Sequence, residues 1–184
     1  MRPVSIIDKN HFVNVAKRRA EDMNLTAAKT KSLARGYFCD QFENLANFQA
    51  HYTTTGPEIY KQCGPAIDAF VMGAGTGGTL AGVCKYLKPK VPNVKMILAD
   101  PQGSGLYHRV VNGILFSPTE SEGRRKRHQV DTIVEGIGIN RITMNWKELE
   151  KDTETGKWVD SAIKVTDQEA VDMSRYLRQH EGRP

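Results

Sequence analysis

The sequence predicts an α/β fold in which helices cover both faces of an open, mostly parallel sheet. The prediction depends mainly on residues 66–100, which follow the order strand, glycine-rich loop, helix, strand. The two strand segments, 66–72 and 94–99, are mostly apolar, as expected of strands buried on both faces of a parallel sheet. The helix between them is expected over 80–87. A strand-helix-strand unit joins parallel strands, so we expect a parallel sheet.

The elements before this unit are predicted from periodicity and from end signals. Apolar residues recur at spacings of three and four over 10–23, which indicates a helix, and Asn24 is a candidate for its C-terminal cap. Residues 37–39 form a candidate short strand. The segment 54–57 is typical of a helix start, because proline is favoured in the first helical turn. We expect that helix to end near Gly64.

The elements after this unit are fewer. Residues 132–134 and 162–165 are candidate strands. Thr166 and Glu169 have the spacing of a capping box, which predicts a helix running to about Gln179.

Composition excludes several classes of protein. The 184 residues are 39% hydrophobic and 26% charged, which is ordinary for a globular protein of one domain, or of one domain with part of another. The three cysteines are scattered and show no zinc-binding spacing, so we expect no metal site and an intracellular location, either cytoplasmic or mitochondrial. No apolar run is long enough to span a membrane.

Four charges of the net +5 come from one basic run at 124–128. We interpret this run as part of a solvated surface loop over 117–128; binding to nucleic acid or to acidic lipid is the alternative. Because no aromatic residues interleave with the basic side chains, we expect no nucleic-acid partner.

The glycine-rich loop is the strongest indication of a binding site. Glycines directly after a buried strand and before a helix let the backbone approach a ligand closely. Their N–H groups and the helix N-terminus then favour a phosphate. A tight turn that simply needs small residues is the structural alternative. The loop consists of Gly75, Thr76, Gly77, Gly78 and Thr79.

Spacing alone does not identify the phosphate. Gly73, Gly75 and Gly78 match the dinucleotide fingerprint, and Asp100 ends the next strand about 20 residues later, where a ribose-binding acid is expected. An NAD(P)-binding oxidoreductase domain is therefore one interpretation. The residue pattern by itself predicts a phosphate-bearing cofactor on an α/β sheet.

Motifs outside the loop resemble the cysteine synthases, also called O-acetylserine sulfhydrylases, to which cystathionine β-synthase is related. The resemblance extends from about Arg2 to Gly182. The motifs are Asp40-Gln41-Phe42-Glu43-Asn44, Ala46-Asn47, His51-Tyr52, Thr54-Thr55-Gly56-Pro57-Glu58-Ile59, the loop at 75–79, Asp100-Pro101 and Gly136-Ile137-Gly138.

The resemblance implies a fold-type II pyridoxal-phosphate enzyme with two α/β domains related to the β-subunit of tryptophan synthase. Residues 1–41 would end the first, smaller domain, and 42–184 would form most of the second, which binds the cofactor phosphate. The loop at 75–79 would hold that phosphate, and Gln41 would contact the carboxylate of an amino-acid substrate. The implied reaction is β-replacement of O-acetylserine by sulfide, in an enzyme that is usually homodimeric. For Gln41, an amide that satisfies a loop is the alternative.

The sequence departs from the family pattern in places that matter for catalysis. It lacks the serine-lysine motif that supplies the Schiff-base lysine, so no catalytic residue is assigned in this chain. The family usually has a small residue and a glycine after Gly138, whereas this chain has 139–141 as Ile-Asn-Arg. We therefore expect a fragment of the parent enzyme that is inactive alone; a non-catalytic regulatory module is a further alternative. The lysines before Gln41 lie in unrelated contexts: Lys9, Lys17, Lys29 and Lys31.

Overall fold

The computed structural model describes residues 8–116, 132–151 and 157–182. The basic run at 124–128 lies outside these residues. The elements, in chain order, are α1 (Phe12–Thr30), α2 (Ala46–Ala50), the π-helix η1 (His51–Thr55), α3 (Gly56–Cys63), β1 (Ala69–Met72), α4 (Gly78–Leu87), β2 (Lys95–Pro101), α5 (Leu106–Asn112), α6 (Met144–Lys147), β3 (Ser161–Val165) and α7 (Asp167–Glu181).

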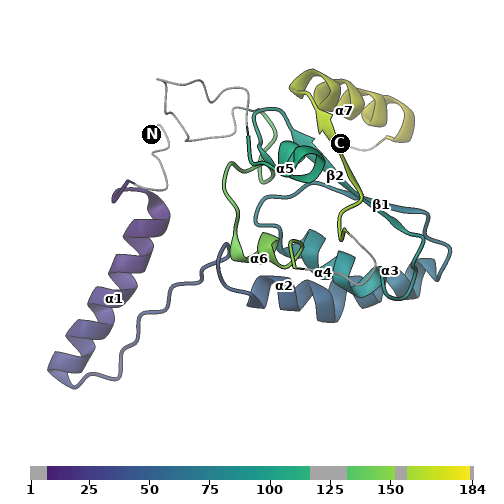
Figure 1. Ribbon diagram of the computed structural model, residues 1–184. Coiled ribbons are helices and arrows are strands. Elements are labelled where there is room, and N and C mark those ends of the chain that lie inside the picture. The colour runs from purple at the N-terminus through teal and green to yellow at the C-terminus, as the bar shows by residue number, and fades with distance from the viewer. Residues whose placement is uncertain (1–7, 117–131, 152–156, 183–184) are drawn as a thin grey trace.

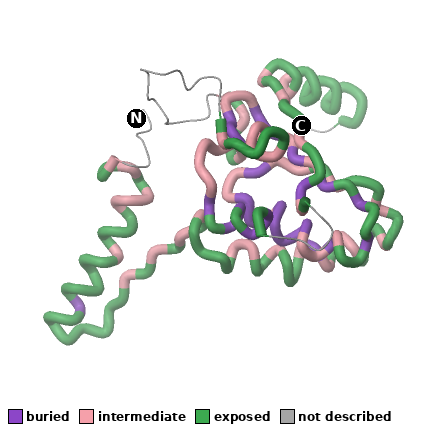
Figure 2. Tube along the Cα trace, in the orientation of Figure 1, coloured by how far each residue is buried: buried purple, intermediate pink, exposed green. Residues whose placement is uncertain are grey.

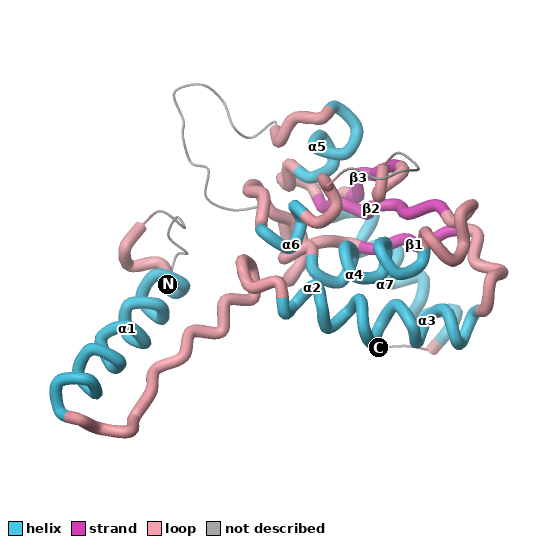
Figure 3. Tube along the Cα trace, turned by 60° about the horizontal axis from the view of Figure 1, so that its bottom comes forward, coloured by secondary structure: helices cyan, strands magenta, loops and turns pink. Residues whose placement is uncertain are grey.

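The sheet is parallel, as predicted. Its three strands lie in the order β1-β2-β3, with Val71 opposite Ile97 and Ile97 opposite Ser161. Helices α2, α3 and α4 lie on one side of the sheet, and α5, which contacts β2 and β3, lies on the other (Figures 1 and 3). The predicted α/β class and the predicted strands of residues 66–100 are therefore confirmed, although β1 begins only at Ala69.

The core is centred on α4. Leu80, Val83 and Leu87 are fully buried, and so are Met96 and Leu98 from β2. Burial is concentrated on α4 and the strands, whereas α1 is mostly exposed (Figure 2). Since α4 is buried on nearly every side, the loop that precedes it is held on a rigid support.

The helix predicted to start at 54–57 is in fact the end of a longer one. Helices α2, η1 and α3 follow one another without a break, and Thr55 has helical backbone angles instead of those of an N-cap. The π-turn lies against Gly82, where a Cβ would stand 2.6 Å from the backbone N of Tyr52. This close packing of η1 against α4 explains the change from an α-helical to a π-helical turn at 51–55, which sequence periodicity does not reveal. The end at Gly64 is confirmed.

Predictions at the N-terminal end are partly wrong. Helix α1 continues past Asn24 to Thr30, and Lys31 provides its left-handed cap. The Asn24 side chain instead accepts from the Gly36 N–H and donates to the Gly36 carbonyl, each at 2.9 Å. Residues 37–39 lie in a loop that pairs with no strand in the described ranges, so they are not the predicted strand.

The C-terminal end differs at one point. Residues 132–134 are not a strand, because Thr132 and the N–H of Ile133 bond to the Asp167 carboxylate instead. The capping box is confirmed, with Thr166 Oγ1 accepting from the Glu169 N–H at 3.2 Å and the Glu169 carboxylate accepting from the Thr166 N–H at 2.8 Å. Within the residues that the structure describes, no helix is both long and apolar enough to cross a membrane.

Candidate functional site

The loop between β1 and α4 is shaped by glycines that tolerate no side chain. Gly77 has φ +83° and caps the start of α4. A Cβ at Gly75 would stand 2.5 Å from the carbonyl oxygen of Gly136, and one at Gly78 would stand 2.2 Å from Asn47 Oδ1. The loop therefore needs glycine both for its backbone angles and for its close neighbours.

A second loop, at 136–138, lies against the first. The Gly138 N–H donates to the Ala74 carbonyl at 2.8 Å, and Gly136 and Gly138 have φ values of +82° and +87°. The Ile137 side chain packs where a Cβ of Gly73 would stand, at 2.8 Å. The two glycine motifs quoted for the family resemblance are thus in contact, although about 60 residues separate them.

The first loop presents backbone donors that have no acceptor in the described part of the chain. These include the N–H groups of Thr76, Gly77 and Thr79, at the N-terminus of α4. Free N–H groups at a helix N-terminus are the donors that a phosphate requires, and the helix dipole adds partial positive charge. The residues present therefore fit a phosphate group.

Both threonines of the loop are hydrogen-bonded to residues distant in sequence. Thr76 Oγ1 accepts from Asn47 Nδ2 at 3.0 Å, and the Thr76 carbonyl accepts from Thr143 Oγ1 at 2.6 Å. Thr79 Oγ1 lies 3.0 Å from His51 Nε2, and the other ring nitrogen of His51 lies 2.9 Å from Thr55 Oγ1. The threonine side chains of the loop are therefore oriented by α2 and η1, and its backbone is held by Thr143, the residue that caps α6.

The segment that contains Gln41 lies beside the loop. The Gln41 carbonyl accepts from Asn47 Nδ2 at 2.7 Å and from Asn145 Nδ2 at 3.2 Å, while the Gln41 side chain is exposed. Asn145 is fully buried and also donates to the Phe42 carbonyl at 2.7 Å. Hence two asparagines fix the backbone of this segment next to Thr76.

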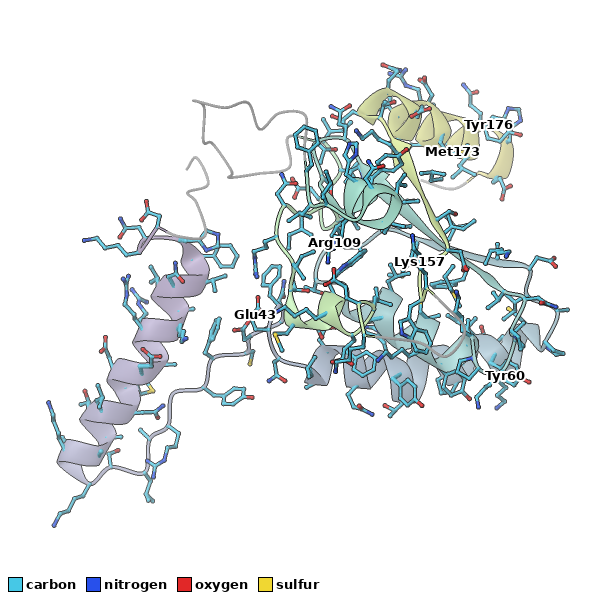
Figure 4. The ribbon with its side chains drawn as sticks, viewed as in Figure 1. Glu43, Tyr60, Arg109, Lys157, Met173 and Tyr176 are labelled. Atoms are coloured by element: carbon cyan, nitrogen blue, oxygen red, sulfur yellow. The ribbon has the colours of Figure 1, made fainter. Side chains whose placement is uncertain are left out.

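A surface ion pair fastens the same segment to the chain that follows the second loop. Glu43 pairs with Arg141, and its Oε2 accepts from the N–H of Met144 at 3.0 Å, at the start of α6 (Figure 4). The Arg141 guanidinium stands over the Phe42 ring at 4.7 Å from its centroid. Arg141 thus helps to hold the Gln41 segment in place.

Asp100 is not placed to bind a ribose. It is fully buried, and its Oδ2 accepts from the Tyr107 N–H at 2.7 Å, at the start of α5. Burial raises the pKa of this carboxyl, against the opposing effect of hydrogen bonds from Tyr107 and Ser104. The carboxylate that the dinucleotide fingerprint requires is buried and bonded to the start of α5. The geometry therefore does not favour a dinucleotide.

Sequence reasoning singled out Gly75, Thr76, Gly77, Gly78 and Thr79, and the structure brings them together in one turn with the Gln41 backbone nearby. It assigned no role to Asn47, His51, Thr143 or Asn145. Asn47 and His51 stand in the quoted motifs, which was the signal available for them. Thr143 and Asn145 carry no such signal, since only the fold places them at the loop.

Comparisons with known proteins agree with this geometry. Residues 10–184 match the family model described as "Pyridoxal-phosphate dependent enzyme". The chain is 52% identical over 180 residues to "Cysteine synthase 2" of Schizosaccharomyces pombe, covering 98% of this chain and 43% of that protein. It is also 52% identical over 187 residues to "Cysteine synthase 2" of Emericella nidulans, covering 98% of this chain and 42% of that one.

A solved structure is also similar. It is the O-acetylserine-dependent cystathionine β-synthase from Helicobacter pylori, with a TM-score of 0.60 and 29% identity, covering 86% of this chain and 44% of that one. The chain thus spans less than half the length of these relatives. Since the family model covers nearly the whole chain, this protein belongs to the pyridoxal-phosphate dependent enzyme family.

Proposed function

We propose that this chain forms the part of a cysteine synthase that holds the cofactor phosphate. The loop at 75–79 would bind the phosphate of pyridoxal phosphate, and Gln41 would contact the carboxylate of the amino-acid substrate. The reaction of the whole enzyme would be replacement of the acetoxy group of O-acetylserine by sulfide. The observation that supports this proposal best is the set of backbone N–H donors at Thr76, Gly77 and Thr79.

The residues of the chain would bind and orient in this reaction. The loop N–H groups and the threonine hydroxyls would hold the phosphate, and the buried helix α4 would keep these donors fixed before the ligand arrives. Gln41 can donate from its amide to a carboxylate, because its side chain is exposed and its backbone is held beside Thr76. When bound, pyridoxal phosphate supplies the electron sink that such a replacement needs.

We further propose that the chain is inactive alone, because its sequence lacks the serine-lysine motif that supplies the Schiff-base lysine in the family. The lysines of α4 and its C-cap are engaged elsewhere: Lys85 pairs with Glu148 at 3.2 Å and Lys88 with Asp160 at 2.8 Å. When purified chain is incubated with pyridoxal phosphate and then desalted, no cofactor absorbance should remain with the protein. An adduct that survives desalting and maps to one lysine would contradict this proposal.

The phosphate site can be tested without covalent chemistry. Pyridoxine 5′-phosphate and pyridoxine differ only by the phosphate, and neither carries the aldehyde that would react with surface lysines. We expect the chain to bind the phosphorylated form at least about 10-fold more tightly, since hydrogen bonds to a charged group contribute about 1.5–3 kcal/mol each. Equal affinity for the two would refute the site, and tight NAD binding would support the dinucleotide alternative.

We also infer that residues 1–41 belong to a smaller domain and 42–184 to the cofactor-phosphate domain. The described residues from α1 to 40 project away from the sheet (Figure 1), and Ala27 is the one buried residue of α1. Limited trypsin digestion should cut at exposed Lys31 and Arg35, as well as in the basic run at 124–127 that we interpret as a surface loop, and should spare the buried helix α4. Simultaneous cleavage within α4 would contradict this division.

A further inference from the structure

Asn47 joins the two halves of the candidate site through one amide group. Its Nδ2 lies 2.7 Å from the Gln41 carbonyl oxygen and 3.0 Å from Thr76 Oγ1. A carbonyl oxygen can only accept, so the Asn47 atom facing it must be the nitrogen. The orientation of the amide is therefore fixed by its surroundings, and both of its N–H groups are used.

This arrangement determines the direction of the Thr76 hydroxyl proton. Thr76 Oγ1 accepts from Asn47 Nδ2 at 3.0 Å and, more weakly, from the Gly78 N–H at 3.4 Å. A hydroxyl oxygen has two lone pairs and one proton. With both lone pairs occupied, the hydroxyl can act toward a third group only as a donor.

The close packing of Asn47 indicates that this orientation is built into the fold. A Cβ at Gly78 would stand 2.2 Å from Asn47 Oδ1, so position 78 is limited to glycine as long as the amide lies there. Helix α2 carries Asn47, and the adjacent Phe48 N–H donates to the buried Asn145 at 3.0 Å, which anchors this helix on α6.

We propose that Asn47 is a positioning residue that directs the Thr76 hydroxyl toward the cofactor phosphate and couples this contact to the Gln41 segment. This inference rests on the proposed function, because it needs the loop at 75–79 to hold a phosphate. Asn47 itself does not touch the ligand; it acts through Thr76.

The test compares two substitutions at the same position. In Asn47→Asp an acceptor replaces the donor, so the Thr76 hydroxyl turns toward the new carboxylate, and a negative charge enters the site. In Asn47→Ala the hydroxyl is free to rotate. We expect affinity for pyridoxine 5′-phosphate to fall by about 10-fold or more in the first and by less in the second, whereas affinity for pyridoxine stays unchanged. Asn93→Asp makes the same charge change on an exposed turn beyond the C-terminal end of α4 and should have no effect.

A double-mutant cycle shows whether Asn47 acts through Thr76. In a Thr76→Val background, Asn47→Ala should no longer change the affinity for pyridoxine 5′-phosphate. The phosphorus NMR signal of the bound ligand should shift in Asn47→Asp and Thr76→Val but not in Asn93→Asp. Circular dichroism and thermal melting identify any variant that has lost its fold. If Asn47→Asp has lost its fold, the comparison of Asn47→Ala with Thr76→Val still decides whether Asn47 acts through Thr76.

The outcomes distinguish failure of the role of Asn47 from failure of the proposed phosphate site. If the unmodified chain binds pyridoxine 5′-phosphate no better than pyridoxine, the phosphate site and the role of Asn47 both fail. If the unmodified chain discriminates and folded Asn47→Asp and Asn47→Ala variants discriminate equally well, the site stands and the role of Asn47 is refuted. Additive effects of Asn47→Ala and Thr76→Val would likewise refute action through Thr76.

Discussion

Replacing Gly75 by alanine should weaken phosphate binding while the chain still folds, with reduced stability. The added Cβ would stand 2.5 Å from the carbonyl oxygen of Gly136, whereas ordinary contact begins at 3.4 Å. The two loops must therefore separate by up to about 1 Å, since backbone on both sides offers no flexible side chain that could move aside. The hydrogen bond from the Gly138 N–H to the Ala74 carbonyl, at 2.8 Å, resists this separation.

The magnitude follows from the atoms that must move. Overpacking a well-packed site costs about 1–3 kcal/mol of folding free energy. A displacement of this size takes the loop N–H groups out of line with a phosphate, and each hydrogen bond to a charged group contributes about 1.5–3 kcal/mol, so losing one lowers affinity by about 10- to 100-fold. We expect Gly75→Ala to fold with reduced stability and to lose most of its preference for pyridoxine 5′-phosphate over pyridoxine.

A matched variant separates strain from damage to the site. Gly113, at the end of α5, has φ +74°, and a Cβ added there would meet no atom within 4 Å, so Gly113→Ala introduces backbone strain of about 1–2 kcal/mol without a steric clash. Urea unfolding measures both stabilities, and calorimetric titration measures both affinities. If Gly75→Ala kept the affinity of the unmodified chain, or if Gly113→Ala lost it equally, the assignment of the loop as the phosphate site would be wrong.

Three further predictions test the environment of the site and the fold. Asp100→Asn should stabilise the chain at pH 7, as measured by urea unfolding. Burial raises the pKa of Asp100 in the folded state, so ionisation of this carboxyl destabilises the fold as pH rises from the unfolded-state pKa to the raised folded-state pKa. The stability gained by Asp100→Asn should therefore disappear below the unfolded-state pKa. A thiol reagent should modify exposed Cys39 and Cys63 rapidly and spare Cys84, whose pKa is raised by burial to about 12; rapid modification of all three in the folded chain would contradict this burial. Thr166→Ala should remove a capping contribution of about 1 kcal/mol, seen as faster hydrogen exchange in the first turn of α7.

The sheet and the phosphate loop were predictable because local sequence determines them. Apolar strand segments on either side of a glycine loop and an apolar helix leave little choice of topology, since a parallel crossover has a fixed hand and a short connection. The capping box of α7 was predictable for the same reason: Thr166 and Glu169 are three residues apart and bond to each other.

The errors lie where distant contacts override local signals. The proline at 57 favours a helix start, but packing of η1 against Gly82 continues the helix through it from Ala46. Asn24 is a residue type favoured at helix C-termini, yet its side chain hydrogen-bonds to the Gly36 backbone and α1 continues to Thr30. Residues 37–39 have strand propensity, but no described strand lies where it could pair with them.

The same distinction explains why glycine spacing suggested the wrong class of ligand. Glycine permits a close approach of the backbone, and a dinucleotide and a pyridoxal phosphate both need that approach. In this chain the groups that orient the loop are Asn47 and Thr143 on Thr76, with His51 beside Thr79. Asp100, which the dinucleotide interpretation required, bonds to the start of α5 instead. The orientation of the proposed phosphate loop thus depends on side chains that the fold brings to it from 28 to 67 residues away, and the spacing of the glycines carries no information about them.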